Sequence, residues 1–222
     1  MILTNRLFVR EIPTREAKSI YIFGEGAKRE LQYFKYFRGM DSRIKVEIYE
    51  LEDDENNSPL GLLNIAKKCI IATENNTNPK YSFQENDEVW IVLDTDKDKG
   101  ESRKYQIEKV RGYCKETESW FLAQSNPCFE VWLYYHLQSE KPIFEENEYC
   151  LGWKELVNKS ISGGFDSRKH PIFIENASNN AEKNYSSQDN IPDIGSTEVF
   201  KLSKSILPLV KIKLMTVISS IE

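Results

Sequence analysis

The chain is poor in cysteine and histidine, with 4 cysteines and 2 histidines among 222 residues. The cysteines, Cys69, Cys114, Cys128 and Cys150, are far apart and form no Cys-x-x-Cys pair. This spacing argues against the common structural zinc sites and is typical of reduced thiols in a cytosolic protein. The sequence also lacks a recognisable Ser-His-Asp or Cys-His arrangement for nucleophilic catalysis.

Long apolar runs are missing as well. No stretch approaches the ~18 apolar residues that a membrane helix needs, and residues 1–6 lack the apolar core of a signal peptide. We therefore expect a cytoplasmic protein with no membrane partner. A length of 222 residues, with 40% hydrophobic and 29% charged residues, suits an ordinary globular chain. It allows one large domain or a core with an appendage.

An excess of positive charge is absent, because the formal net charge is −5. This balance argues against a protein that grips nucleic acid over its whole surface. It does not exclude a nuclease, since metal ions, a local basic patch or a partner can supply the affinity. The acidic run 52–55 is interpreted as a solvated loop.

Apolar strands alternate with amphipathic helices over the first part of the chain. This alternation predicts an α/β fold with a mostly parallel sheet and helices on both faces. We expect residues 1–139 to form this domain and residues 140–222 to form a mainly helical extension packed on it. Pro208 is expected to kink or end the last helix. The expected strands are 20–23, 44–51, 88–93 and 119–123, and helices are expected over 27–38, from 59 to 73, over 101–115 and after 125–127.

Two of the expected strands end in acidic residues. Glu25 follows the apolar run 20–23, and Asp94 and Asp96 follow the run 88–93. Ligands of parallel α/β folds bind beyond the carboxyl ends of the strands, so the three acids are expected to meet there. Unpaired carboxylates repel each other and need a cation. We therefore expect all three to ligate Mg²⁺ or Mn²⁺.

The Asp94-x-Asp96 motif has several interpretations. On a strand both carboxylates point the same way, while Thr95 points away, so the pair can share one cation or hold two. Alternatively, a strand simply runs into a polar turn. An EF-hand loop is excluded, because Lys99 and Tyr105 stand where Gly and Glu are required. Haloacid-dehalogenase phosphatases carry a similar motif on the first strand, not the third. Nucleotide-sugar transferases also use an Asp-x-Asp motif with a metal ion, but no other feature of this sequence supports that function.

The segment after the first strand offers further candidates. Gly26 begins a helix whose N–H groups favour phosphate, but Arg29 stands where the third glycine of a dinucleotide fingerprint belongs. Lys28 and Lys97 are either phosphate contacts or plain surface lysines. Glu30 is either a supporting neighbour of the acids or an exposed residue.

The segment 125–136 supplies the remaining candidates. Glu130 lies on the first turn of the helix expected after Pro127, near the carboxyl edge of the sheet, and is a candidate member of the acidic cluster. His136 lies about 240° around that helix from Glu130. We interpret His136 as a structural neighbour more than a catalytic residue, and Cys128 as a core residue.

Together these segments resemble the RloB-like family. The resemblance covers roughly residues 18–138, and Arg29 departs from it where a small Thr commonly precedes the second Glu. The residues that carry the resemblance are Glu25-Gly26 with Glu30 and Tyr33-Phe34, the run DEVWIVLDTD at 87–96, and the run SNPCFEVWLYYH at 125–136.

The resemblance implies a place in the TOPRIM superfamily, which includes topoisomerases, primases and overcoming-lysogeny-type nucleases. That superfamily pairs a glutamate after the first strand, here Glu25, with an Asp-x-Asp after the third, here Asp94 and Asp96. RloB-like proteins are associated with bacterial restriction loci and abortive infection, often beside an AAA or ABC-like ATPase. We therefore expect a Mg²⁺-dependent nuclease of antiviral defence, in which Glu25 ligates metal or acts as general base.

Two alternatives to this expectation remain open. The chain could instead be a non-catalytic binding partner of the ATPase, or a phosphatase or nucleotidyl-transfer enzyme of TOPRIM type. The sequence does not distinguish an RNA substrate from a DNA substrate, and it leaves the oligomeric state open.

Overall fold

The computed structural model describes residues 8–26, 29–96 and 100–220, and its elements confirm the α/β class. Strands and helices alternate through the first four strands, as the sequence pattern predicts. The elements are β1 (Lys18–Gly24), α1 (Arg29–Lys35), β2 (Ile44–Ile48), α2 (Pro59–Ile70), β3 (Glu88–Asp94), α3 (Gly100–Glu116), β4 (Trp120–Asn126), α4 (Glu130–Tyr134), α5 (Cys150–Ser160), a 3₁₀ helix (His170–Phe173), α6 (Ile174–Lys183), β5 (Ser187–Gln188), β6 (Ile191–Pro192), β7 (Ser196–Thr197) and α7 (Val199–Ser219).

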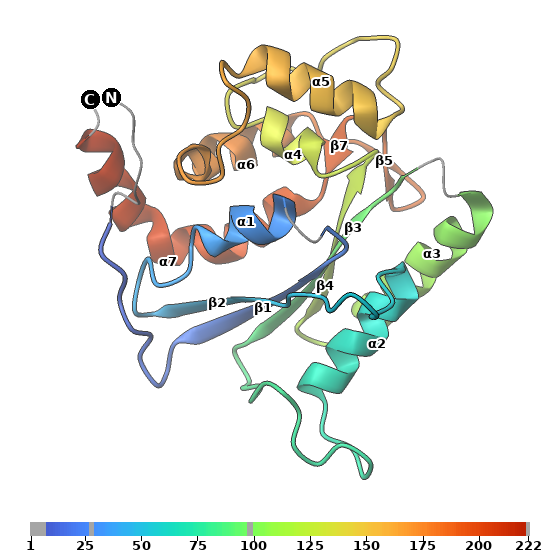
Figure 1. The fold of residues 1–222 in the computed structure, drawn as a ribbon, viewed down its shortest axis with the longest axis vertical. Coiled ribbons are helices and arrows are strands. Elements are labelled where there is room, and N and C mark those ends of the chain that lie inside the picture. Colours follow the sequence, from blue (N-terminus) through green and yellow to red (C-terminus); the bar gives the residue numbers. More distant parts are fainter. Residues whose placement is uncertain (1–7, 27–28, 97–99, 221–222) are drawn as a thin grey trace.

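The main sheet has the strand order β2-β1-β3-β4-β7. The first four of these strands are parallel, and only the short β7 is antiparallel to its neighbour. In the ladder between β1 and β3, Gly24 pairs with Val92, so the two strands end close together. Figure 1 shows their arrowheads at the same edge of the sheet. The mostly parallel sheet predicted from the sequence is confirmed.

Each face of the sheet packs against its own hydrophobic core. Figure 1 shows α2 and α3 on one face and α1 with α4 to α7 on the other. Along β1, Ile20 and Ile22 point into the core under α1, whereas Tyr21 and Phe23 point into the core under α2 and α3. Burial on both faces explains why β1 and β3 are continuously apolar.

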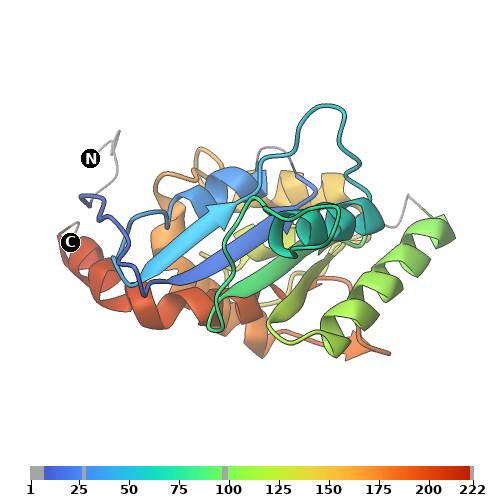
Figure 2. The ribbon, with the colours of Figure 1, turned by 90° about the horizontal axis from the view of Figure 1, so that it is seen from below.

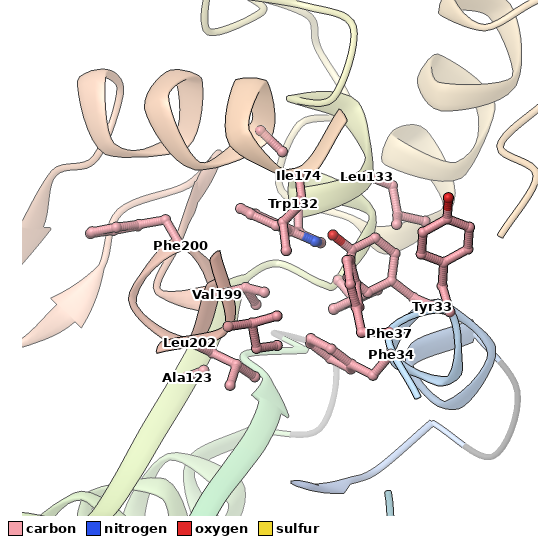
Figure 3. Close-up of a cluster of buried hydrophobic side chains, with 14 of the residues drawn as sticks. Tyr33, Phe34, Phe37, Ala123, Trp132, Leu133, Ile174, Val199, Phe200 and Leu202 are labelled. Atoms are coloured by element: carbon pink, nitrogen blue, oxygen red, sulfur yellow. The ribbon is translucent and has the colours of Figure 1, made fainter. Parts of the chain in front are cut away.

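The larger core joins elements that are far apart in the sequence. Phe34 of α1, Trp132 of α4 and Leu202 of α7 are fully buried in it, as Figure 3 shows.

The segment after residue 139 is mainly helical, as predicted, and it also adds β7 to the sheet. A domain boundary at residue 139 stays a prediction. None of the helices in the described part of the chain has the length and apolarity needed to span a bilayer.

The start of α2 follows directly from its sequence. The Ser58 side chain accepts a hydrogen bond from the N–H of Gly61 at 3.2 Å, and Pro59 occupies the first helical position. The helix ends at Ile70, three residues before the predicted end.

Several other predicted boundaries are also wrong. Helix α1 ends at Lys35, not at residue 38, and a chain of turns follows it. Strand β4 runs through Ser125 to Asn126, where a helix start is predicted, because these residues pair with β7. Helix α7 continues past Pro208 to Ser219, so the proline does not end the helix, and a kink there stays a prediction. Pro208 is exposed, and solvent on this side of α7 can donate to the carbonyl that would otherwise accept a hydrogen bond from residue 208.

Candidate active site

Carboxylates from four segments gather at the carboxyl edge of the sheet. Glu25 follows β1, Asp94 ends β3, Glu30 lies in the first turn of α1, and Glu130 begins α4. Glu30, Glu25 and Glu130 all act electrostatically on Asp94. The structure therefore brings together four of the candidates named from the sequence.

Asp94 has the most perturbed carboxyl of this cluster. Burial raises its pKa well above the ordinary 3.8, and repulsion from Glu30, Glu25 and Glu130 raises it further. Within residues 8–26, 29–96 and 100–220, its side chain forms no hydrogen bond or ion pair. A carboxyl in this state is stabilised by a proton or by a bound cation.

Glu30 is buried beside the loop that follows β1. Its side chain lies so close to Gly26 that an added Cβ at this glycine would stand 1.7 Å from Oε2 of Glu30. Burial raises the pKa of Glu30, and repulsion from Glu130 adds to this. The interpretation of Glu30 as an exposed residue is wrong, because the residue is only 8% exposed.

Two arginines hold members of the cluster in place. Arg103 of α3 donates to the Glu25 carboxylate, to the Asp94 carbonyl at 2.5 Å and to the Thr95 carbonyl at 3.1 Å. Arg29 forms an ion pair with Glu130 at 2.7 Å. These pairings fix where the carboxylates stand relative to the strand ends.

Arg103 is a site residue that is not among the candidates predicted from the sequence, although a signal for it exists. Arg103 lies on the buried side of α3, in line with Ile107 and Val110 at helical spacing. An arginine on the apolar side of a helix needs an acidic or carbonyl partner, because a buried charge is costly when it is unpaired. Its partner here comes from a segment 78 positions away along the chain.

Asp96 is placed differently from the prediction. Strand β3 ends at Asp94, and Asp96 has a left-handed backbone with φ of 47°. Its N–H donates a hydrogen bond to the Pro127 carbonyl at 3.0 Å. This hydrogen bond turns the backbone away from the direction of β3. The expectation that strand geometry turns both aspartates the same way is therefore wrong. Asp96 lines a neighbouring cavity of about 320 Å³ together with Lys104 and Gln124.

His136 belongs to the aromatic core. Its Nε2 lies 3.0 Å from the Tyr33 hydroxyl, and its Nδ1 lies 3.0 Å from the Trp132 carbonyl. Burial lowers its pKa to about 3, so the ring is neutral near pH 7. The candidate phosphate contacts Lys28 and Lys97 lie outside the described residues.

Two cysteines border the acids. The thiols of Cys128 and Cys150 interact with each other, and Glu130 acts electrostatically on both. This contact and burial raise the pKa of the Cys128 thiol, which is 1% exposed. Cys128 is thus a buried neutral thiol, and its interpretation as a core residue is confirmed.

The donor chemistry of the cluster suits a hard divalent cation. Asp94 and Glu30 offer oxygen ligands in a crowded anionic setting, which Mg²⁺ or Mn²⁺ would relieve. The described residues contain no group of three or more His, Cys, Asp or Glu side chains already arranged around a metal position. Binding would therefore require a small rearrangement, such as the exchange of an arginine partner by Glu25 or Glu130.

Comparison with known proteins gives one match. A family model described as RloB-like protein matches residues 20–206, which include Glu25, Asp94 and Glu130. Neither the curated proteins nor the solved structures contain a match.

Proposed function

The chain belongs to the RloB-like protein family, and we propose that it is a divalent-metal-dependent nuclease that hydrolyses phosphodiester bonds of RNA or DNA in bacterial antiviral defence. The observation that carries this proposal is the Asp94 carboxyl, which lies among Glu25, Glu30 and Glu130 and has no side-chain partner within the described residues. Repulsion within such a cluster lowers stability, and a cation at this edge of the sheet relieves it. The TOPRIM relationship is part of this proposal.

Asp94 and Glu30 are the residues that would hold Mg²⁺ or Mn²⁺, together with Glu25 once it exchanges its arginine partner. Asp96 lines the neighbouring cavity and would have to turn towards them to join. When bound, the ion supplies a Lewis acid that neutralises charge on the phosphate and lowers the pKa of water. The protein contributes the fixed positions of its carboxylates. Arg103 holds Glu25 beside the end of β3, and a Glu25 that exchanges this partner would ligate the ion or accept a proton from water.

Substitution of Asp94 tests the proposal. The Asp94→Asn protein is expected to cleave labelled RNA or DNA at least about a hundredfold more slowly than wild type in Mg²⁺ or Mn²⁺, because a group acting on the transition state is lost. Asp53→Asn, in the exposed loop after β2, is the matched control and should cleave normally. Equal rates for Asp94→Asn and wild type would overturn the assignment.

A second candidate function has a specific observation in its favour. Glu25 and Glu130 already have arginine partners, so the carboxylates can serve structure alone in a non-catalytic partner of an AAA or ABC-like ATPase. Thermal melting with and without Mn²⁺ separates the two functions. A catalytic site predicts that Mn²⁺ raises the Tm of wild type and not that of Glu25→Gln. A structural site predicts no rise in either protein.

A further inference from the structure

A cavity of about 380 Å³ lies at the amino ends of the strands, at the opposite edge of the sheet from the acids. It is formed by the segment 13–21 that leads into β1, by Lys45 of β2 and by the loop 80–84 that precedes β3. Figure 2 shows this loop passing beside β1. The volume is within the range of small-molecule sites, about 300–1,000 Å³.

The charge of this cavity is opposite to that of the whole chain. Arg15, Lys45 and Lys80 line it, and no carboxylate is among the described residues of its wall. The chain as a whole has 35 acidic and 30 basic side chains. A local concentration of three cations in an acidic protein creates a positive potential that attracts anions.

Two of the three cations lack a carboxylate partner in the described part of the chain. Arg15 is exposed and forms no ion pair there. Lys80 lies 4.4 Å from the centre of the Tyr49 ring and also forms no ion pair there. Lys45 is partly neutralised by Glu47, at 3.3 Å. Arg15 and Lys80 therefore keep their charge available for a ligand.

The nearest buried acid is already used by the backbone. Asp87 accepts hydrogen bonds from the N–H of Ser19 at 2.7 Å and from the N–H of Gln84 at 3.0 Å. One carboxylate thus ties β1 to the loop before β3, and both of its oxygens have backbone donors. Asp87 therefore shapes the wall of the cavity, and its charge, like that of Glu47, acts on Tyr21 in this wall.

Tyrosines make the wall rigid and add a donor. The Tyr21 hydroxyl donates to the Ser82 carbonyl at 2.9 Å, and the rings of Tyr21 and Tyr81 are 4.8 Å apart. Burial raises the pKa of Tyr81 to about 12, so its hydroxyl stays protonated near pH 7. A fixed wall with hydroxyl, guanidinium and ammonium donors suits an anion with several oxygens.

We propose that this cavity binds the phosphate groups of a nucleotide or of a nucleic acid strand, with Arg15 and Lys80 as its main cationic contacts. The guanidinium of Arg15 matches two phosphate oxygens at once, and Lys80 supplies a mobile point charge. The volume admits more than one phosphate group. This site is independent of the acidic cluster and of the proposed nuclease activity.

Binding to the full-length protein in EDTA tests the site without metal at the acids. Tripolyphosphate and ATP are titrated by calorimetry, and a labelled single-stranded oligonucleotide is followed by fluorescence anisotropy. Arg15→Ala/Lys80→Ala is expected to weaken binding at least about tenfold. For the oligonucleotide, the slope of log Kd against log salt should fall by about 0.7 for each phosphate that the variant no longer neutralises.

The control variants separate this site from general charge and from the acids. Lys109→Ala/Lys159→Ala removes two exposed positive charges elsewhere and should bind as wild type does, as should Asp94→Asn. Binding of tripolyphosphate and ATP alone identifies a nucleotide site, and binding of the oligonucleotide identifies a strand site. Both results support the proposal. The proposal is wrong if no probe binds wild type, or if Arg15→Ala/Lys80→Ala binds as the control does.

Discussion

Arg103 of α3 and Glu25, which follows β1, form an ion pair in which the two side chains are only 6% and 11% exposed. The same guanidinium donates to the backbone carbonyls of Asp94 and Thr95. One side chain therefore connects the ends of the two neighbouring strands β1 and β3. The arrangement of the acids depends on α3 as much as on the strands that carry them.

Removal of Arg103 should destabilise the fold strongly. Arg103→Ala leaves the Glu25 carboxylate buried without this partner, and breaking a buried pair costs about 3–5 kcal/mol. Urea unfolding gives the change in the free energy of unfolding. The control is Arg168→Ala, whose ion pair with Asp166 has a 67% exposed arginine side chain. It should cost about 0–1 kcal/mol. Equal losses of stability in the two variants would contradict a structural role for Arg103.

The charge of Asp94 should lower stability as the pH rises. Its pKa is raised in the folded protein, so the folded chain retains a proton that the unfolded chain loses above about pH 3.9. The contribution of Asp94 to the free energy of unfolding is thus full at low pH and is lost as the pH rises through the folded pKa. Asp94→Asn cannot ionise and should lack this loss.

Melting curves in EDTA between pH 4 and 8 measure this effect. Asp94→Asn should have a higher Tm than wild type at pH 7, by about 2–4 °C for each kcal/mol of relieved repulsion. Asp53→Asn lies in an exposed loop and serves as the control, with a Tm close to that of wild type. A lower Tm for Asp94→Asn than for wild type at pH 7 would show that the Asp94 charge is stabilising.

A methyl group at Gly26 should displace Glu30. Because the added Cβ would stand 1.7 Å from a carboxylate oxygen of buried Glu30, Gly26→Ala is expected to cost about 1–3 kcal/mol. The cost should be smaller in a Glu30→Ala background, which a double-mutant cycle in urea measures. Gly112→Ala in α3 meets no atom within 4 Å and should stabilise by up to about 1 kcal/mol. Additive effects of Gly26→Ala and Glu30→Ala would rule out this contact.

His136 should not titrate between pH 5 and 8. Burial lowers its pKa to about 3, below the ordinary 6.5. A lowered pKa in a base means that its contribution to stability is full above about pH 6.5 and is lost as the pH falls towards 3. NMR of the ring protons measures the titration directly, and His136→Phe identifies the signals. A midpoint near 6.5 would show that the ring is open to solvent.

The local pattern of apolar and polar residues was sufficient to predict most strands and helices and several of the candidate site residues. The apolar runs of β1 and β3, buried on both faces, identify the central strands without further information. The parallel connection then brings Glu25 and Asp94 to the same edge of the sheet. Ser58 and Pro59 likewise mark the start of α2 through contacts within one helical turn.

The missed features depend on partners that are remote along the chain. Strand β4 extends to Asn126 because β7 pairs with it from 70 positions further on, and Asp96 leaves the strand because its N–H finds the Pro127 carbonyl. Arg103 acquires its role only when α3 packs beside the end of β1. None of these partners is visible in a window of ten or twenty residues.

The sequence by itself determined the order of strands and helices and the delivery of acids to the carboxyl ends of β1 and β3, because hydrophobic period and strand direction are local properties. Tertiary structure alone decided which carboxylates of the described residues are paired, that Asp94 has no partner among them, and that cations gather around the cavity at the other end of the sheet. Burial and electrostatic energy depend on every neighbour in three dimensions, and packing brings most of those neighbours from distant parts of the chain.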